Sequence, residues 1–303
     1  MAKPIIVVLA AGMGSRYGGL KQMDKIGKSG EVLLDYSVFD ARRSGFGKAV
    51  FIIRRDIEKD FREIVLGRIE KKFPCEVVFQ ELDSLIPGDL VRESRGAGRV
   101  KPWGTAHALL CAQEKIDAPF CIINADDFYG SEAFAVMAPY LSAGAVSEGA
   151  IVPYQLKKTL SPMGTVTRGV CEVQDAYLVS VDELTAIARE GDGKIYNTSG
   201  GAKQFLDDDT PVSMNFWGFP ASIFKDLRRY FDDFLAKSGK EVKSECYLPM
   251  AADWFIKNRL LKIKVLEADA PWFGVTYRED REAALKRIAE LTAAGVYPES
   301  LWA

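Results

Sequence analysis

The chain has 303 residues, of which 48% are hydrophobic and 27% are charged, and its formal net charge is -2. This composition excludes a disordered chain, and the near-neutral charge excludes a large nucleic-acid-binding surface. No apolar stretch is long enough to span a bilayer, and no signal peptide precedes the first predicted strand, so we expect no membrane partner. The five cysteines are scattered singly, which favours the reducing cytoplasm over an oxidising compartment.

The first predicted element is a strand over residues 5–9, an unbroken apolar run that is typical of a buried parallel strand. A glycine-rich loop follows it and carries Ser15, Arg16 and Lys21. Glycine lets a backbone approach an anion closely, and the two cations add full charge, so the loop suits a polyphosphate. A dinucleotide-binding fingerprint is excluded because Tyr17 replaces its third glycine, and a P-loop is excluded because glutamine follows Lys21.

Strands and helices then alternate along the first half of the chain. Helical spacing of apolar residues predicts helices over 34–45, 61–73 and 104–116. Apolar runs predict strands at 49–53, 77–79, 120–123 and 149–153. This alternation predicts a parallel sheet covered by helices on both faces, with ligands at the carboxyl ends of the strands. The irregular segment 81–101 is open to two interpretations, a lid over a ligand or a solvated insertion.

Two adjacent carboxylates, Asp126 and Asp127, follow the strand predicted at 120–123. Such a pair at the end of a buried strand is costly unless a cation or solvent meets it. Mg²⁺ binds through one or two carboxylates together with substrate phosphates. Asp126 is therefore the candidate metal ligand, and Asp127 either supports it or caps the following turn.

The strand and glycine-rich loop resemble the start of the sugar-phosphate nucleotidyltransferases, also called nucleotide-sugar pyrophosphorylases. Their pattern is a strand, Leu-Ala-Ala-Gly-x-Gly-[Ser/Thr]-Arg, a spacer and Pro-Lys. Here the run from Leu9 to Arg16 matches, and Lys21 matches with leucine in place of the proline. The resemblance implies that the loop backbone faces the base and ribose, that Arg16 neutralises the outgoing phosphates and that Lys21 acts on the α-phosphate. The residues implied are Ala10, Ala11, Gly12, Gly14, Ser15, Arg16 and Lys21.

A second match to this family is Gly104-Thr105-Ala106, at the start of a predicted helix. In the family such a start, with a glutamine before it, holds the nucleobase through backbone groups and the amide. This implies that Gln80, Gly104 and Thr105 bind the base. The only histidine, His107, lies on the same alanine- and leucine-rich helix, so we expect it to be packed or capping rather than catalytic.

Beyond residue 153 the pattern becomes β-rich and is expected to hold the acceptor. Strands are predicted at 164–167, 170–173, 178–181 and 212–219. The family carries an acidic residue, often followed by lysine, that holds the sugar and its phosphate. Glu183 matches, but leucine follows it, which leaves Lys194, Lys203 or a different acceptor open. Asn215 is the one amide in its apolar strand, and the resemblance implies that it lies beside the sugar.

The C-terminal part is predicted to contain helices over 223–235 and 246–256, a strand at 263–266 and a last helix through 288 and 291. The family closes its site with Trp-x-Asp-Val-Gly-Thr, whose aspartate is often a second metal ligand. Trp272 matches, but no aspartate stands at that place, and nothing selects between Asp269 and Asp280. We therefore expect the metal to be held by Asp126, phosphate oxygens and water.

The matches imply one α/β/α Rossmann-like nucleotidyltransferase domain over 1–303, with a mostly parallel, mixed sheet. Its expected parts are a nucleotide-binding half (1–150), a β-rich acceptor part (151–220) and a helical part that closes the site (221–303). They also imply Mg²⁺-dependent transfer of a nucleoside monophosphate from a nucleoside triphosphate, UTP in first place, to a sugar 1-phosphate. A cytidylyltransferase acting on a small alcohol phosphate or phosphocholine, and a non-catalytic nucleotide-sensing module, are the alternatives.

Several aromatic residues allow two interpretations. Trp103, Trp217 and the segment 297–302 could form a contact in a homo-oligomer or be buried in the core of one chain.

Overall fold

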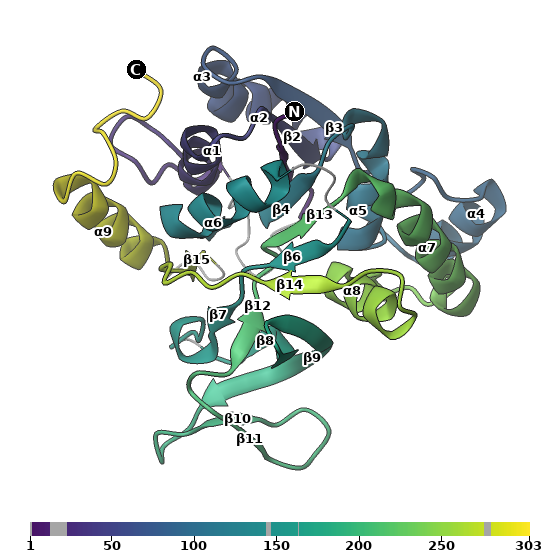
Figure 1. Cartoon of the computed structure of the whole chain (residues 1–303). Coiled ribbons are helices and arrows are strands. Elements are labelled where there is room, and N and C mark those ends of the chain that lie inside the picture. Colours follow the sequence, from purple (N-terminus) through teal and green to yellow (C-terminus); the bar gives the residue numbers. More distant parts are fainter. Residues whose placement is uncertain (1, 13–22, 144–146, 163, 276–279) are drawn as a thin grey trace.

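The structure is a computed structural model of the chain, and it describes residues 2–12, 23–143, 147–162, 164–275 and 280–303 (Figure 1). Its strands are β1 (Ile5–Leu9), β2 (Lys48–Ile53), β3 (Cys75–Phe79), β4 (Phe120–Asn124), β5 (Asp127–Phe128), β6 (Gly149–Ile151), β7 (Tyr154–Gln155), β8 (Val166–Gln174), β9 (Tyr177–Arg189), β10 (Ile195–Asn197), β11 (Gln204–Leu206), β12 (Pro211–Ser213), β13 (Trp217–Phe219), β14 (Ile263–Val265) and β15 (Phe273–Gly274). The helices are α1 (Leu33–Ser44), α2 (Glu58–Phe61), α3 (Gly67–Ile69), α4 (Gly88–Gly96), α5 (Thr105–Cys111), α6 (Ser131–Ser142), α7 (Phe224–Ser238), α8 (Leu248–Lys257) and α9 (Asp280–Ala293). Within the described residues, no helix has both the length and the apolar character needed to cross a membrane.

In the described part of the chain, one sheet of 13 strands has the order β3-β2-β1-β4-β13-β6-β14-β9-β8-β12-β7, with β10 and β11 attached beside β9. The first four strands are parallel, and the register sets Leu9 beside Ile52 on one side and Asn124 on the other. The carboxyl ends of β1, β3 and β4 therefore meet at one edge. Such an edge is where open α/β sheets bind ligands.

Helices cover both faces of the parallel strands, with α1 and α6 on one side and α5, α7 and α8 on the other (Figure 1). Successive residues of a strand point to opposite faces, and β1 obeys this rule. Ile6 and Val8 join the core under α1, whereas Ile5 and Val7 join the core under α5. The unbroken apolar run is thus explained by burial on both faces, and the predicted mixed α/β architecture is confirmed.

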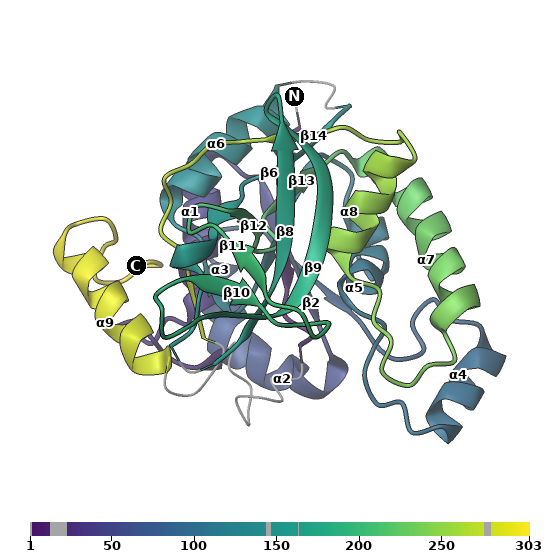
Figure 2. The same cartoon turned by 90° about the horizontal axis from the view of Figure 1, so that it is seen from below.

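The β-rich part is built from antiparallel pairs, and its longest elements are β8 and β9. They form one twisted hairpin that runs beside α8 and β14 (Figure 2). The prediction of three short strands in this region was wrong, because β8 is continuous through Gly169 and β9 extends to Arg189.

Two further predictions were wrong in detail. The apolar run 212–219 is two strands, β12 and β13, because Asn215 adopts a left-handed backbone with φ 61° and ends the first strand. The irregular segment 81–101 contains a helix, α4, in its middle. The polar composition of this segment gives no apolar helical periodicity, so the sequence did not predict the helix. Contact with a distant part of the chain supports it, since the Ser94 hydroxyl donates to the Gly239 carbonyl (3.5 Å).

The aromatic residues that could have formed a subunit contact are used inside the chain. Trp103 and Trp217 are fully buried. The Tyr297 hydroxyl donates a hydrogen bond to Asp40 (2.7 Å), and the Trp302 indole N–H donates to Asp35 (2.9 Å), both on α1. These residues therefore dock the C-terminus onto α1, and the interpretation of burial within one chain holds for them.

Candidate functional site

A cavity of about 380 Å³ opens at the carboxyl ends of β1, β3 and β4, and we call it the strand-end cavity. It gathers eight of the residues that the sequence selected: Ala11, Gly12, Gln80, Gly104, Thr105, Asp126, Glu183 and Asn215. These residues come from six segments that are far apart in the chain. The sheet register and the start of α5 bring them together.

The other predicted residues lie elsewhere or cannot be placed. Ala10 is buried beneath the cavity wall, where its N–H donates to the Ile52 carbonyl (2.8 Å). Gly14, Ser15, Arg16 and Lys21 lie outside the described residues.

Arg54, which the sequence did not single out, holds the start of the glycine-rich loop. Its guanidinium donates to the carbonyls of Ala11 and Gly12, each at 3.3 Å. It is also paired with Asp56 (2.8 Å), which keeps its charge partly neutralised. Its two contacts with carbonyl oxygens fix the loop backbone where the chain leaves β1.

Gly104 makes the close backbone contact that completes one wall. It has φ +96°, and a Cβ atom there would lie 2.6 Å from the carbonyl oxygen of Cys246. The backbone of Cys246 bonds to Trp103 O (2.8 Å) and to Ala106 N (3.0 Å). This contact brings Glu245 and Tyr247 to the cavity, although they lie about 140 positions further along the chain.

The segment 81–101 supports the same wall from outside. Arg99 is buried, stacks on the Trp103 ring (3.7 Å), and donates to the carbonyls of Glu241 (2.9 Å), Val242 (3.0 Å) and Ser244. Arg99 thereby holds residues 241–244, which lead directly to Glu245 at the cavity wall. Lys101, at the end of this segment, lines the cavity itself.

A polar network connects the acidic pair to Asn215. Asn215 Nδ2 donates to Asn124 Oδ1 (3.3 Å), and Asn124 Nδ2 donates to Asp127 Oδ2 (2.8 Å). Asp127 is buried and thus orients the two amides, whereas Asp126 lines the cavity. Asn215 Oδ1 is buried and has no hydrogen-bond partner among the described residues. An acceptor in this condition at a cavity wall is suited to a donor or cation on a ligand.

The segment that matches the family's closing motif has Gly274 at the place of the aspartate, and this glycine lies against the polar network. Gly274 on β15 lies opposite Asp127 on β5, and a Cβ at Gly274 would lie 2.5 Å from Asp127 Oδ1. Asp127 therefore occupies the space that a side chain at 274 would need. Among the described residues, no group of three or more His, Cys, Asp or Glu side chains could hold a metal alone.

A second cavity of about 220 Å³, the acceptor-side cavity, shares Asn124, Asp126, Glu183 and Asn215 with the first. Burial raises the pKa of the Glu183 carboxyl, and the Arg168 charge nearby partly lowers it again.

Arg168 lies on β8 opposite Leu184 of β9, so a cation faces the position after Glu183 from the neighbouring strand. The sequence did not single out Arg168. The sequence left Lys194, Lys203 or a different acceptor open. Lys203 pairs with Glu190, and Lys194 lies over the Phe205 ring at 5.9 Å, in the region of β10 and β11.

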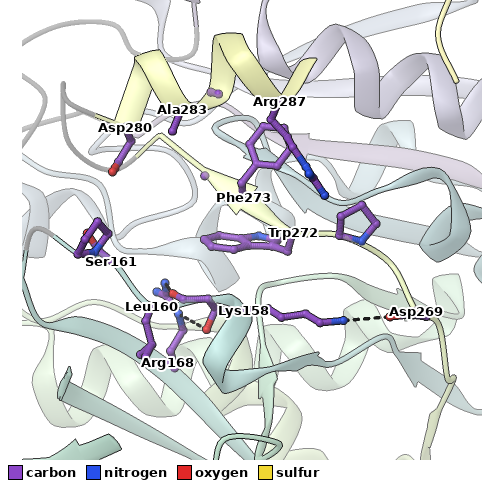
Figure 3. Close-up of a pocket in the computed structure, with 15 residues that line it drawn as sticks. Lys158, Leu160, Ser161, Arg168, Asp269, Trp272, Phe273, Asp280, Ala283 and Arg287 are labelled. Carbon is purple, nitrogen blue, oxygen red and sulfur yellow. Dashed lines mark hydrogen bonds and ion pairs between the residues drawn. The ribbon is translucent and has the colours of Figure 1, made fainter. Parts of the chain in front are cut away.

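A third cavity of about 710 Å³ adjoins the second at Arg168 and Trp272, whose ring centroid lies 5.3 Å from the guanidinium (Figure 3). Asp269 and Asp280 line this third cavity and neither of the two that Asp126 lines. Asp269 is paired with Lys158 (2.9 Å), as the dashed line in Figure 3 marks. Neither aspartate is thus placed beside Asp126.

No protein-family model matches the sequence, and a search of curated proteins finds no match. Solved structures do match, and the three described here each have a TM-score of 0.62. An inositol-1-phosphate CTP transferase from T. maritima is 14% identical, over 96% of this chain and 98% of that chain. The chain has the fold of the sugar-phosphate nucleotidyltransferases.

Two further structures support this nucleotidyltransferase fold. A protein from Bacillus anthracis assigned as a glucose-1-phosphate thymidylyltransferase, solved with a sucrose, is 11% identical, over 93% of this chain and 94% of that chain. A UDP-glucose pyrophosphorylase complexed with UDP-glucose is 14% identical, over 96% and 99%. The resemblance inferred from short motifs is thus confirmed for the fold over nearly the whole chain.

Proposed function

We propose that the protein is a divalent-metal-dependent nucleotidyltransferase that acts on a sugar 1-phosphate. It transfers a nucleoside monophosphate from a nucleoside triphosphate, UTP in first place, and releases pyrophosphate. The observation that carries the proposal is the strand-end cavity, whose wall is formed by residues from separate sequence motifs. The nucleotidyltransferase fold supports the same reaction class.

The reaction joins two anions and needs little covalent help from the protein. An oxygen of the acceptor phosphate forms a bond to the α-phosphorus while the bond to the bridging oxygen of the β-phosphate breaks in line. Pyrophosphate leaves with that electron pair. Because the acceptor phosphate is already ionised, catalysis depends on positioning and on charge stabilisation.

The cations of the glycine-rich loop supply this charge in the proposal. Lys21 stabilises the α-phosphoryl group in the transition state, and Arg16 stabilises the departing pyrophosphate. Arg54 contributes by holding the backbone of Ala11 and Gly12 under the ligand.

Asp126 would hold Mg²⁺, because it lines both adjoining cavities and so faces the place where donor and acceptor meet. The donor set fits a hard cation, because Asn215 lines the same two cavities and its amide oxygen has no hydrogen-bond partner among the described residues. A metal ion held by these residues would supply charge neutralisation at the phosphate oxygens. Asp127 keeps Asn124 and Asn215 oriented toward the same space.

The acceptor-side cavity receives the sugar phosphate. Glu183 accepts hydrogen bonds from sugar hydroxyls, and Arg168 supplies the cation that the sequence left open. Gly169, opposite Glu183 on the hairpin, lets the strands pack closely here, since a Cβ atom there would lie 3.0 Å from Val181 Cγ1.

A cytidylyltransferase that acts on a polyol or other alcohol phosphate is the second candidate. The solved inositol-1-phosphate CTP transferase favours it, because its fold matches this chain as well as the sugar enzyme does. The two candidates differ only in base and acceptor.

The test is pyrophosphate release with Mg²⁺ across UTP, dTTP, CTP, GTP and ATP. Each triphosphate is paired with sugar 1-phosphates, inositol 1-phosphate and phosphocholine. The proposal expects release with UTP and one sugar 1-phosphate, and release only with CTP and an alcohol phosphate would favour the second candidate. Nucleotide binding without any release would contradict both and indicate a sensing module.

A further inference from the structure

The side-chain amide of Gln80 is fixed by two acceptors. Its Nε2 atom lies 2.9 Å from the carbonyl oxygen of Gly104 and 3.0 Å from His107 Nδ1. A backbone carbonyl can only accept, so the Gln80 atom that faces Gly104 is the nitrogen, whichever way an amide is first drawn. Both amide hydrogens are then in use, and His107 Nδ1 must carry a lone pair.

His107 is fixed in the same way from its other side. Its Nε2 atom lies 2.7 Å from the carbonyl oxygen of Ser84, which can only accept, so Nε2 carries the hydrogen. The ring is fully buried and stacks on Phe231 at 5.2 Å. Burial, with a smaller contribution from Arg99, lowers the pKa of His107 to about 4, although the Ser84 bond opposes this. The imidazole is therefore neutral with one tautomer.

This network decides which end of the amide faces the ligand. Gln80 lines the strand-end cavity, and its Nε2 is bound to Gly104 and His107. The remaining polar atom is Oε1, for which the described residues provide no donor. The wall thus presents a hydrogen-bond acceptor. Ser84 belongs to segment 81–101, so this segment fixes the amide through His107.

We propose that His107 is a positioning residue that holds Gln80 Oε1 toward the nucleobase and so selects a base with a protonated ring nitrogen. Uracil and thymine present N3–H, and guanine presents N1–H, to such an acceptor. Cytosine N3 and adenine N1 carry lone pairs, which an acceptor repels; these bases can meet Oε1 only by shifting to use their amino groups. The inference rests on the proposed function and makes its base class specific.

The His107 network can be tested without any substrate, because His107 is the only histidine in the chain. Nitrogen-15 NMR of histidine-labelled protein should show one imidazole, protonated at Nε2 and not at Nδ1. It should stay neutral as the pH falls from 8 to 5. A ring protonated at Nδ1, a mixture of tautomers, or protonation near the ordinary histidine pKa of about 6.5 would overturn the proposal.

Base selection is tested with the wild-type chain, His107→Phe and the control Cys111→Ala. Phenylalanine keeps the stacking on Phe231 but removes the acceptor for Gln80, whereas Cys111 contacts His107 Nε2 (3.6 Å) on its other side. Dissociation constants are measured for UTP, dTTP, GTP, CTP and ATP. Wild type and Cys111→Ala should prefer the first three, and His107→Phe should reduce the UTP-to-CTP preference about tenfold with kcat at saturating UTP within about twofold.

The outcomes separate the inference from the proposed function. Preference for CTP or ATP with normal pyrophosphate release, or an unchanged UTP-to-CTP ratio in folded His107→Phe, would overturn the role of His107 and leave the reaction class intact. Failure of every triphosphate to bind would refute the proposed function and base selection together. The NMR spectrum would still decide the His107 network.

Discussion

The strand-end cavity and the acceptor-side cavity share a wall but are built by different means. The first lies where parallel strands end, and the amide nitrogen of Gln80 there is already held by Gly104 and His107. The second is built from antiparallel strands, and the wall that it shares with the first holds the left-handed Asn215 and the half-buried Glu183. Among the described residues, the side-chain oxygen of Asn215 has no hydrogen-bond partner. Strain and unmet polar groups tend to gather at functional sites. Under the proposed function, Gln80 is therefore held in place before the nucleotide binds, whereas the wall with Asn215 and Glu183 is completed by the ligands.

Removing the proposed metal ligand should affect both cavities and give the largest effect. Asp126→Asn is expected to lower kcat by about 10²-fold to 10³-fold, because charge stabilisation at the transferred phosphate is lost. The isosteric control Asp127→Asn, which alters the support of Asn124 and Tyr129 but leaves Asp126 in place, should lose less. Initial rates at saturating substrates over a Mg²⁺ series measure this. Equal losses in the two variants would contradict the assignment of Asp126.

Changing Gly104 should disturb the strand-end cavity alone. Gly104→Ala is expected to lower the free energy of unfolding by ~2–4 kcal/mol, because φ is +96° and the Cβ would lie 2.6 Å from Cys246 O. Gly98→Ala is the control, since φ is +92° there but the space around it is open. Denaturant unfolding gives both values. If Gly98→Ala lowers the free energy of unfolding as much as Gly104→Ala does, the contact with Cys246 does not account for the effect at Gly104.

Arg168→Gln should weaken the acceptor-side cavity and spare the nucleotide. The KM for the acceptor is expected to rise about 20-fold, as for loss of a charged hydrogen bond to phosphate, with KM for the triphosphate unchanged. Arg189→Gln, on the same hairpin but paired with Asp208 on the surface, is the control. Steady-state kinetics with each substrate varied in turn would measure both KM values. A parallel rise in the two KM values would contradict separate sites for the acceptor and the triphosphate.

The smallest effect concerns the cost of burying Glu183. Its pKa is raised in the folded protein, so the charged form is disfavoured there, and the fold loses stability as the pH rises through that raised pKa. Glu183→Gln removes this cost. Thermal unfolding should therefore show the variant more stable than wild type at pH 7 and equal to it at pH 3, while acceptor binding weakens. Lower stability of the variant at pH 7 would show that the charge is stabilising.

The two cavities also differ in how far the sequence predicts them. At the strand-end cavity, residues such as Gly12, Gln80 and Asp126 directly follow apolar strands, and a parallel sheet brings strand ends together. Glu245 and Tyr247 could not be found this way, because only the packing of Cys246 against Gly104 brings them there.

At the acceptor-side cavity the sequence selected Glu183 but missed Arg168. The register of β8 on β9 places this cation opposite the residue after Glu183, and pairing between strands is not visible in the spacing of either strand. The apolar run around Asn215 predicts a single strand for a related reason. Its break depends on a single left-handed residue, which apolar periodicity does not report.

The most direct test of the account is mass spectrometry of the products formed from UTP, Mg²⁺ and a panel of sugar 1-phosphates, with pyrophosphate counted in the same samples. The account predicts one nucleotide sugar for each pyrophosphate released, and neither product when the acceptor is left out. Pyrophosphate with free nucleoside monophosphate and no conjugate would indicate hydrolysis. That result, or bound nucleotide with no product at all, would contradict nucleotidyl transfer as the function of this chain.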